Sequence, residues 1–178
     1  MFFVDAAHFV LGAFLGMLWC FSRIFVKSGA GRQRSSVLGA LDSHSKEIIK
    51  VTTEDNVHAG TVWELLEKIR LAHPDVPVTL ILDNARYQHC RCTEDKASVL
   101  NIELLFLPAY GPNLNLIERL WKLVKKECLL NCYHANFTSS KAAIDGCFDQ
   151  FGSQSKDKLY SLASLNFQFF PFPKTSCA

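Results

Sequence analysis

Three acidic side chains stand where the character of the sequence changes. Asp5 and Asp83 each end a run of apolar residues, and Glu118 lies in the first turn of a predicted helix. In a mixed sheet, neighbouring strands that end at the same edge bring their terminal side chains together, and a helix docked there adds a third. Such a cluster of like charges is unfavourable unless cations neutralise it. Carboxylates together with phosphate oxygens suit Mg²⁺, and two such ions can promote an in-line displacement at phosphorus.

Each of these acids also has a purely structural interpretation. Asp83 and Asn84 are typical turn residues at the end of a strand. The spacing Asn115-x-x-Glu118 resembles a capping box, in which the glutamate serves only the start of the helix. Asp5 could be a hydrogen-bonded acid at a strand end. Taken one at a time, the structural interpretation is favoured for each acid, and only the combination favours a metal site.

The elements that position these acids begin with β-strands. Aromatic and branched residues predict strands at 2–5 and 18–26, and segments 36–41 and 47–51 form a predicted hairpin. We expect the sheet to open with three antiparallel strands. Later strands are predicted at 78–83, buried on both faces, and at 102–107, which ends at Pro108.

Helical periodicity appears between and after the later strands, at about 62–69, 92–100, 114–130 and 139–151. In the strongest of these helices one face carries Ile117, Leu120, Trp121, Val124 and Cys128, with Trp121 expected to pack in the core. The order predicts an α/β fold with a mixed five-stranded sheet and helices on both faces. No repeat or linker divides residues 1–178, so we expect one domain, with the tail from about 167 unassigned.

Positive charge is concentrated rather than general. The chain of 178 residues has a net charge of only +2, but residues 23–50 hold six basic and two acidic side chains, a local excess of +4. Arg32 and Arg34 lie in this segment and are candidates for contact with phosphates, although a solvated basic loop is equally compatible. The glycines beside them lack the spacing of a nucleotide-binding loop, so no nucleotide cofactor is expected.

Two lysines follow Glu118 on its own helical face. Lys122 and Lys125 lie four and seven residues beyond it and could hold a nucleic-acid backbone. The alternative is an ordinary ion pair between Glu118 and Lys122. His8 and His89 lie near the two aspartates in the sequence, and a structural role is favoured for both.

Cysteine usage and hydropathy bound the environment of the chain. The seven cysteines form no CxxC pair, and His89-Cys90-x-Cys92 lacks a second pair, so structural zinc is not expected. An odd count without a secretion signal suits free thiols in a reducing cytoplasm. The apolar run 9–21 is 13 residues long (21 − 9 + 1), too short to span a bilayer, and we expect it to be buried core or to face a partner.

Three blocks of sequence resemble one known family. Residues 107–121, LPAYGPNLNLIERLW, are similar to the signature around the glutamate of mariner-superfamily transposases of bacterial insertion sequences. The block 80–85 resembles the one that holds their second aspartate, and 3–9 the one that holds the first. Between Asp83 and Glu118 lie 34 residues (118 − 83 − 1), a spacing typical of that family. The resemblance extends over roughly 2–135.

This resemblance implies an RNase H-like DDE endonuclease domain in which Asp5, Asp83 and Glu118 are the catalytic and metal-binding residues. The implied cofactor is Mg²⁺ or Mn²⁺, as two ions. The implied reaction is cleavage of DNA at the ends of a mobile element and strand transfer into target DNA at TA sites, by a homodimer or larger assembly. The implied partners are transposon ends and target DNA, without a membrane.

The sequence also departs from the family pattern. Ala109, Gly111 and Leu116 stand where relatives often carry Pro, Ser and Pro. Relatives usually begin with a helix-turn-helix region, which we expect to be absent here. Two alternatives therefore remain open. The chain could be a catalytically idle remnant that binds DNA or a full-length transposase, or a repair or RNA-processing nuclease on the same fold.

Overall fold

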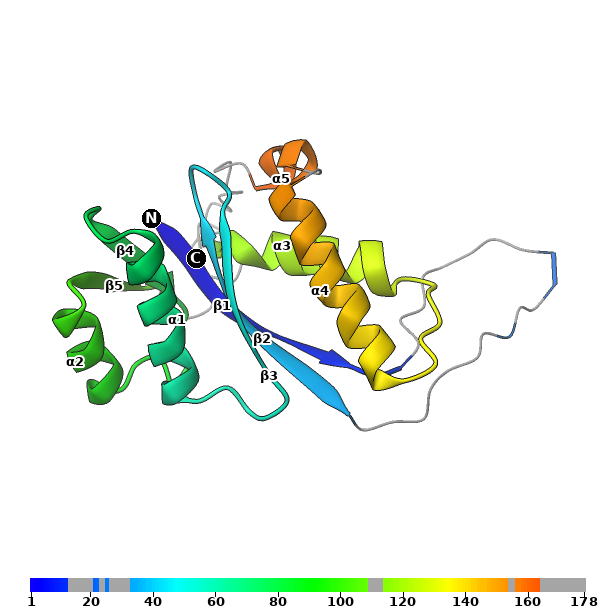
Figure 1. Cartoon of the computed structure of the whole chain (residues 1–178), viewed down its shortest axis with the longest axis horizontal. Coiled ribbons are helices and arrows are strands. Elements are labelled where there is room, and N and C mark those ends of the chain that lie inside the picture. The colour runs from blue at the N-terminus through cyan, green and yellow to red at the C-terminus, as the bar shows by residue number, and fades with distance from the viewer. Residues whose placement is uncertain (13–20, 23–24, 26–32, 109–113, 154–155, 164–178) are drawn as a thin grey trace, which may run out of the picture.

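The computed structural model describes residues 1–12, 21–22, 25, 33–108, 114–153 and 156–163, and within them a single sheet organises the chain. Its order is β3-β2-β1-β4-β5 (Figure 1). β1, β2 and β3 are antiparallel neighbours, whereas β4 and β5 run parallel to β1. The strands are β1 (Phe2–Val10), β2 (Arg34–Asp42), β3 (Ile48–Thr53), β4 (Val78–Leu82) and β5 (Ile102–Phe106).

Helices cover both faces of this sheet, as Figure 1 shows. α1 (Ala59–Ala72) and α2 (Arg91–Val99) lie on one face. The other face carries α3 (Ile117–Val124), the π-helical turn η2 (Lys125–Leu129), α4 (Phe137–Ser153) and α5 (Lys156–Leu162). The expected α/β architecture, a mixed five-stranded sheet between two helical layers, is therefore confirmed.

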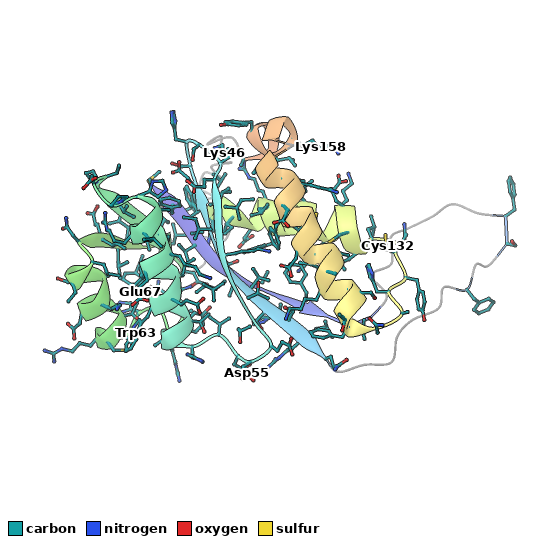
Figure 2. All side chains as sticks on the ribbon, viewed as in Figure 1. Lys46, Asp55, Trp63, Glu67, Cys132 and Lys158 are labelled. Atoms are coloured by element: carbon teal, nitrogen blue, oxygen red, sulfur yellow. The ribbon has the colours of Figure 1, made fainter. Side chains whose placement is uncertain are left out.

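The central strand β1 supplies both hydrophobic cores because its side chains alternate between the faces. Phe2 and Val4 join the core beneath α1, and Phe3, Ala7 and Phe9 join the core beneath α3 and α4. Side chains fill the space between the sheet and each helical layer (Figure 2). A strand buried in this way needs apolar residues at nearly every position, which explains the run at the start of the chain.

Most predicted elements are confirmed, but the first strand is longer than expected. β1 continues five residues past Asp5 because β2 pairs with it as far as Val10. Asp5 therefore lies inside β1, and the prediction that it ends the strand is wrong. The pairing of β1 with β4 is confined to Phe2 and Phe3. Asp5 therefore lies beyond the last residue of β1 that is paired with β4. The predicted strand 78–83 is also less buried than expected, because Thr79 and Ile81 are half-buried.

Two further expectations are changed. The helix predicted over 114–130 begins at Ile117 and becomes a π-helical turn at Lys125. The extra residue of a π-turn shifts the helical phase, so Cys128 is only half-buried. α5 was not predicted.

Some expectations concern residues outside the described ranges. The predicted strand 18–26 lies mostly there, and its described residues Phe21 and Phe25 are exposed and not in a strand. The apolar run 9–21 begins with the buried Phe9, but 13–20 are outside. The tail from 167 lies outside as well. Over the described part of the chain, no helix is long and apolar enough to cross a membrane.

Candidate active site

Two of the predicted acids lie just beyond the pairing of β1 with β4. Parallel pairing aligns Phe3 of β1 with Ile81 of β4. Asp5 lies two residues after Phe3, and Asp83 lies two residues after Ile81, directly after the end of β4. Phe3 and Ile81 both face the core beneath α3. Side chains alternate between the two faces of a sheet, so Asp5 and Asp83, each two residues farther along, are expected on that same face.

The third acid, Glu118, comes from the helix that is docked against β1. Asn115, just before α3, donates a hydrogen bond from Nδ2 to the backbone oxygen of Val4 at 3.2 Å. Trp121 donates from Nε1 to Oδ2 of Asp5 at 3.1 Å. These two contacts straddle Glu118 and fix the first turn of α3 beside Asp5.

The structural alternative for Glu118 is wrong. α3 begins after Leu116 without any side-chain cap, and Asn115 uses its amide nitrogen on β1 instead of capping the helix. The Glu118 side chain makes no hydrogen bond or ion pair with the described residues. The turn interpretation of Asp83 holds in part, because its Oδ1 accepts a hydrogen bond from the amide of Ala85 at 3.3 Å.

The electrostatics of Asp5 show that the three acids share one neighbourhood. The pKa of Asp5 is raised to about 6, mainly by burial and also by the negative charges of Asp83 and Glu118. Hydrogen bonds from the Ala6 amide and from Trp121 act in the opposite direction. Among the described side chains, none of the three acids forms an ion pair with a basic group.

The donor set suits a hard divalent cation, but the oxygens are not drawn together into a ligand shell. Carboxylates are the ligands that Mg²⁺ and Mn²⁺ prefer, and three of them without a protein cation favour binding of a metal cation. Within the described residues, however, no group of three His, Cys, Asp or Glu side chains is close enough to hold an ion. The three carboxylates therefore fit a divalent cation by their chemistry, whereas their described positions do not form a ligand shell.

Trp121 has a second role that sequence reasoning missed, which is its hydrogen bond to Asp5. It is buried, as expected, and packs edge-on against Phe9 and Phe148. Its indole also crosses the backbone of Gly39, which pairs with Asp5 across β1 and β2. A Cβ at Gly39 would lie 2.6 Å from Cη2 of the indole, so this position needs a glycine. Helical spacing alone cannot reveal these contacts of Trp121, because Asp5 and Gly39 lie on β1 and β2.

Tyr87 was also missed. The pKa of its phenol is raised to about 12, mainly by burial and also by the negative charges of Asp83 and Asp5. The ring therefore lies in the same electrostatic neighbourhood as the two aspartates. The only signal in the sequence was its position four residues after Asp83.

The four basic candidates have different surroundings. Lys122 is exposed and forms no ion pair with Glu118, so the alternative of an ordinary helical ion pair is wrong. Lys125 holds its ammonium 5.9 Å from the centre of the Phe9 ring. Arg34 is exposed and donates a hydrogen bond to Asn56.

Distance separates Arg34 from the acids. It pairs with Val10, five residues along β1 from Asp5, or about 17 Å at the usual strand rise. Arg32, Ala109 and Gly111 lie outside the described residues. Of the described basic candidates, Lys122 shares α3 with Glu118, and Lys125 begins the π-helical turn that continues α3.

The two histidines have structural partners, as expected. His8 shares a hydrogen bond with Ser36 at 2.9 Å. His89 lies 3.0 Å from a carboxylate oxygen of Glu94 and stacks on Phe106 with ring centres 4.4 Å apart.

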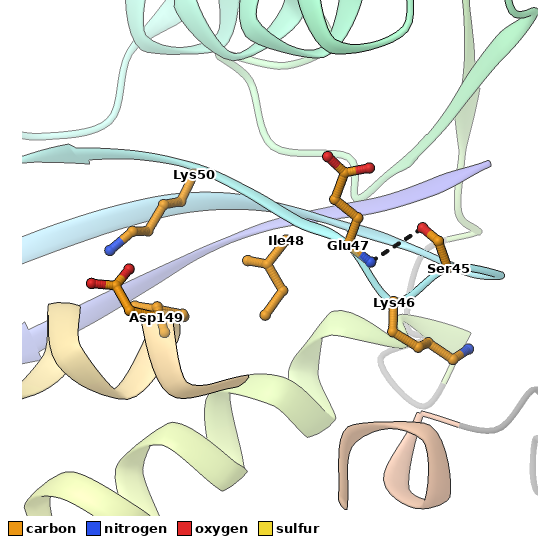
Figure 3. A pocket seen from close by; sticks show the side chains of 7 residues that line it. Ser45, Lys46, Glu47, Ile48, Lys50 and Asp149 are labelled. Atoms are coloured by element: carbon orange, nitrogen blue, oxygen red, sulfur yellow. Dashed lines mark hydrogen bonds between the residues drawn. The ribbon is translucent and has the colours of Figure 1, made fainter. Parts of the chain in front are cut away.

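A pocket of about 590 Å³ lies elsewhere, between the β2–β3 turn and α4 (Figure 3). Lys50 reaches toward α4 and pairs with Asp145, and Lys46 donates to the backbone oxygen of Ala163 at 2.7 Å. Both cations are thus used within the fold. The pocket is lined by Ser45, Lys46, Glu47, Ile48, Lys50, Phe148 and Asp149, none of which is a predicted site residue.

Comparison with known proteins agrees with the fold. A family model described as DDE superfamily endonuclease matches residues 2–141. No curated protein sequence matches the chain. A solved Mos1 transposase paired-end complex with left transposon end is similar, with a TM-score of 0.66 and 14% identity over 94% of this chain and 56% of that chain.

Two further solved structures are similar. A Mos1 mariner paired end complex with Mn has a TM-score of 0.65 and 13% identity over 96% of this chain and 56% of that one. The solved catalytic domain of Mos1 mariner transposase has a TM-score of 0.56 and 15% identity, over 96% of this chain and 83% of that one. The chain thus spans little more than half the length of the two complexed transposases. At these identities the likeness shows the fold, which is RNase H-like, whereas the family model covers most of the chain. The chain therefore belongs to the DDE superfamily endonucleases.

Proposed function

We propose that this chain is the catalytic domain of a DNA transposase, and that Asp5, Asp83 and Glu118 are its catalytic, metal-binding residues. The proposal is carried by one observation. Asp5 lies on β1, Asp83 directly follows the neighbouring strand β4, and Glu118 lies in a helix that is hydrogen-bonded to β1, so that the charges of Asp83 and Glu118 both act on Asp5. None of these three acids is neutralised by a described basic side chain. The family membership supports the same reading.

The proposed reaction has two steps at one site. Water cleaves a phosphodiester at the end of the element and leaves a 3′-hydroxyl, which then attacks a phosphodiester of target DNA at a TA site. When bound, Mg²⁺ or Mn²⁺, as two ions, supplies stabilisation of charge on the attacking and leaving oxygens. Asp5, Asp83 and Glu118 would hold the ions, and Trp121 orients the carboxylate of Asp5.

The surroundings of the acids suggest how DNA is held. Lys122 follows Glu118 in α3, Lys125 begins the π-helical turn after it, and Lys122 is exposed without an acidic partner among the described residues. Both are proposed to contact the DNA backbone near the acids, whereas Arg32 and Arg34 would contact it farther away. Lysine contacts with phosphate position the duplex without reading its sequence.

The partners follow from the same comparison. The solved Mos1 complexes are described as paired-end complexes, one of them with left transposon end and one with Mn. By analogy, the partners proposed here are transposon ends, target DNA and further copies of this chain, in the cytoplasm.

Metal-dependent nicking of supercoiled plasmid tests the proposal. The wild-type chain is compared with Asp83→Asn and Glu118→Gln in Mg²⁺ and in Mn²⁺. Asp55→Asn is the matched control, because Asp55 is exposed in the connection between β3 and α1 (Figure 2). We expect nicking to be lost in both site variants, by about 100-fold or more, and kept in the control. Equal nicking by all four proteins would exclude these acids.

One observation favours a second candidate function. The described acids are not close enough to one another to hold an ion unaided, as expected if the chain is an idle transposase that binds DNA or a full-length transposase. In that case the wild-type chain would not nick DNA. Asp83→Asn would still bind DNA, or inhibit an active transposase, as well as wild type does.

A further inference from the structure

Two thiols meet at the start of α2, on the surface and outside the proposed catalytic site. Cys90 is the N-cap residue of α2, and its sulfur lies 2.8 Å from the sulfur of Cys92. The hydroxyl of Thr93 lies 3.1 Å from the same sulfur. Cys92 is exposed and Cys90 is half-buried, so reagents in solution reach this pair.

The two thiols differ in acidity in the way that stepwise exchange requires. The pKa of Cys90 is lowered by its hydrogen bonds with Cys92 and with Thr93. The pKa of Cys92 is raised because its own thiol is the partner in that hydrogen bond. A helix N-terminus also favours a thiolate. Cys90 is therefore the nucleophile of the pair, and Cys92 stands beside it as the resolving thiol.

We propose that Cys90 and Cys92 form a site of reversible thiol–disulfide exchange whose co-substrate is a low-molecular-weight disulfide such as oxidised glutathione. The thiolate of Cys90 attacks one sulfur of the small disulfide, breaks its S–S bond and releases one small thiolate. Cys92 then loses its proton to solvent and attacks the Cys90 sulfur, releasing the second small thiolate. The two cysteines are oxidised to one disulfide, and the small disulfide is reduced to two thiols.

The geometry allows a disulfide to form between Cys90 and Cys92. A disulfide needs Cα atoms within about 4.4–6.8 Å, and residues two apart in a chain are never more than about 7 Å apart. The sulfurs need to approach by less than about 1 Å to reach the bond length of roughly 2.0 Å. Cys132 makes a useful contrast. It is exposed in the segment between η2 and α4 (Figure 2), but among the described cysteines none is hydrogen-bonded to it.

The site is joined to the loop that follows Asp83. The Thr93 hydroxyl donates to the backbone oxygen of Tyr87 at 3.2 Å, and the Cys90 thiol contacts the same oxygen at 3.7 Å. Forming the disulfide removes the thiol proton that makes the second contact. The inference does not rest on the proposed function, because thiol exchange needs neither metal nor DNA.

Trypsin offers a direct test, because Arg91 lies between the two cysteines. Cleavage after Arg86, Arg91 and Lys96 puts Cys90 in the peptide 87–91 and Cys92 in the peptide 92–96. The native chain is equilibrated in a buffer of reduced and oxidised glutathione, its free thiols are blocked with an alkylating reagent, and it is digested without reduction. We expect the two peptides to leave as one disulfide-linked species, lighter by two hydrogens than the pair of free-thiol peptides. Reduction before blocking should separate them.

Two variants sharpen the result. In Cys92→Ser the resolving thiol is gone, so Cys90 should retain glutathione as a mixed disulfide. Cys132→Ser should leave the linked peptides at the wild-type level. The proposal is overturned if 87–91 and 92–96 are recovered separately, whether as alkylated thiols or with glutathione on each.

Discussion

Both faces of the sheet are covered by helices, but the two faces differ in the side chains that lie between the helices and the sheet. Under α1, the contact layer is mainly apolar: Val62, Leu65, Leu66 and Ile69 are all buried, with Thr61 as a buried polar residue beside them. Its polar contacts lie outside, as in the ion pair that joins Lys96 of α2 to Glu67 of α1.

Under α3, polar groups lie inside the contact layer. Trp121 donates to Asp5, Asn115 donates to the backbone of Val4, and the remaining oxygen of Asn115 is buried without a partner. Buried polar groups that are incompletely bonded reduce stability. The comparison teaches that the face under α1 is held mainly by apolar packing, whereas the face under α3 also carries polar contacts from the helix to Asp5 and to the backbone of β1.

The largest expected effect uses matched leucines on the two faces. Leu66 and Leu120 are both fully buried, under α1 and α3 respectively. Truncating either to Ala should lower the free energy of unfolding by about 2–5 kcal/mol in denaturant titrations. Only Leu120→Ala should also reduce nicking by the folded fraction, because Leu120 supports the turn that carries Glu118. Equal nicking by both variants would contradict the claim that only the face under α3 supports the activity.

The acidity of Asp5 predicts an inverted pH dependence. Its pKa is about 6 in the folded chain, against an ordinary value of 3.8. The folded state therefore holds this proton more tightly, and the stabilisation present below about pH 4 is lost as the pH rises through about 6.

We expect the wild-type free energy of unfolding to fall in that window by on the order of 2–3 kcal/mol relative to Asp5→Asn. Millimolar Mn²⁺ should restore the stability above the window, because a bound cation replaces the proton. Denaturant titrations at several pH values measure both effects. Parallel curves for the two proteins would contradict the shift.

A smaller effect is expected at Gly39. A methyl group there would meet the Trp121 indole at 2.6 Å, and relieving such overlap typically costs about 1–3 kcal/mol. We expect Gly39→Ala to lower thermal stability and to weaken nicking, because the indole must move away from Asp5. Gly146→Ala is the control, since a Cβ on that glycine meets nothing within 4 Å. The steric argument fails if the two variants behave alike.

The smallest change is the loss of one hydrogen bond. Trp121→Phe keeps an aromatic ring in the core but removes the N–H that bonds Asp5. Partners that orient a metal-binding side chain contribute about tenfold or more to affinity, so we expect Mn²⁺ to bind about tenfold more weakly. The melting temperature should change little. Unchanged Mn²⁺ affinity would mean that the indole is only a packing group.

The face under α1 was the more predictable of the two. Its helix was found from the spacing of Val62, Leu65, Leu66 and Ile69, a local signal that the structure follows. The strands β4 and β5 were found equally well, from short apolar runs that end at Asp83 and Pro108.

The other face depends on contacts between distant segments. The three acids were named by their resemblance to a family, and composition alone would not have named them. β1 reaches Val10 only because β2 pairs with it, and Trp121 reaches Asp5 across 116 residues of sequence. The π-turn at Lys125 has no periodic signal either. Local patterns found the elements, but the polar contacts between α3 and β1 required the structure.

The central claim is that Asp5, Asp83 and Glu118 together bind a divalent cation. A calorimetric titration of Mn²⁺ into the folded chain, without DNA, tests it most directly. We predict saturable binding by the wild type and by Asp55→Asn, and affinity at least about tenfold weaker in Asp5→Asn, Asp83→Asn and Glu118→Gln alike. Equal affinity in all five proteins would place the metal elsewhere and contradict the assignment.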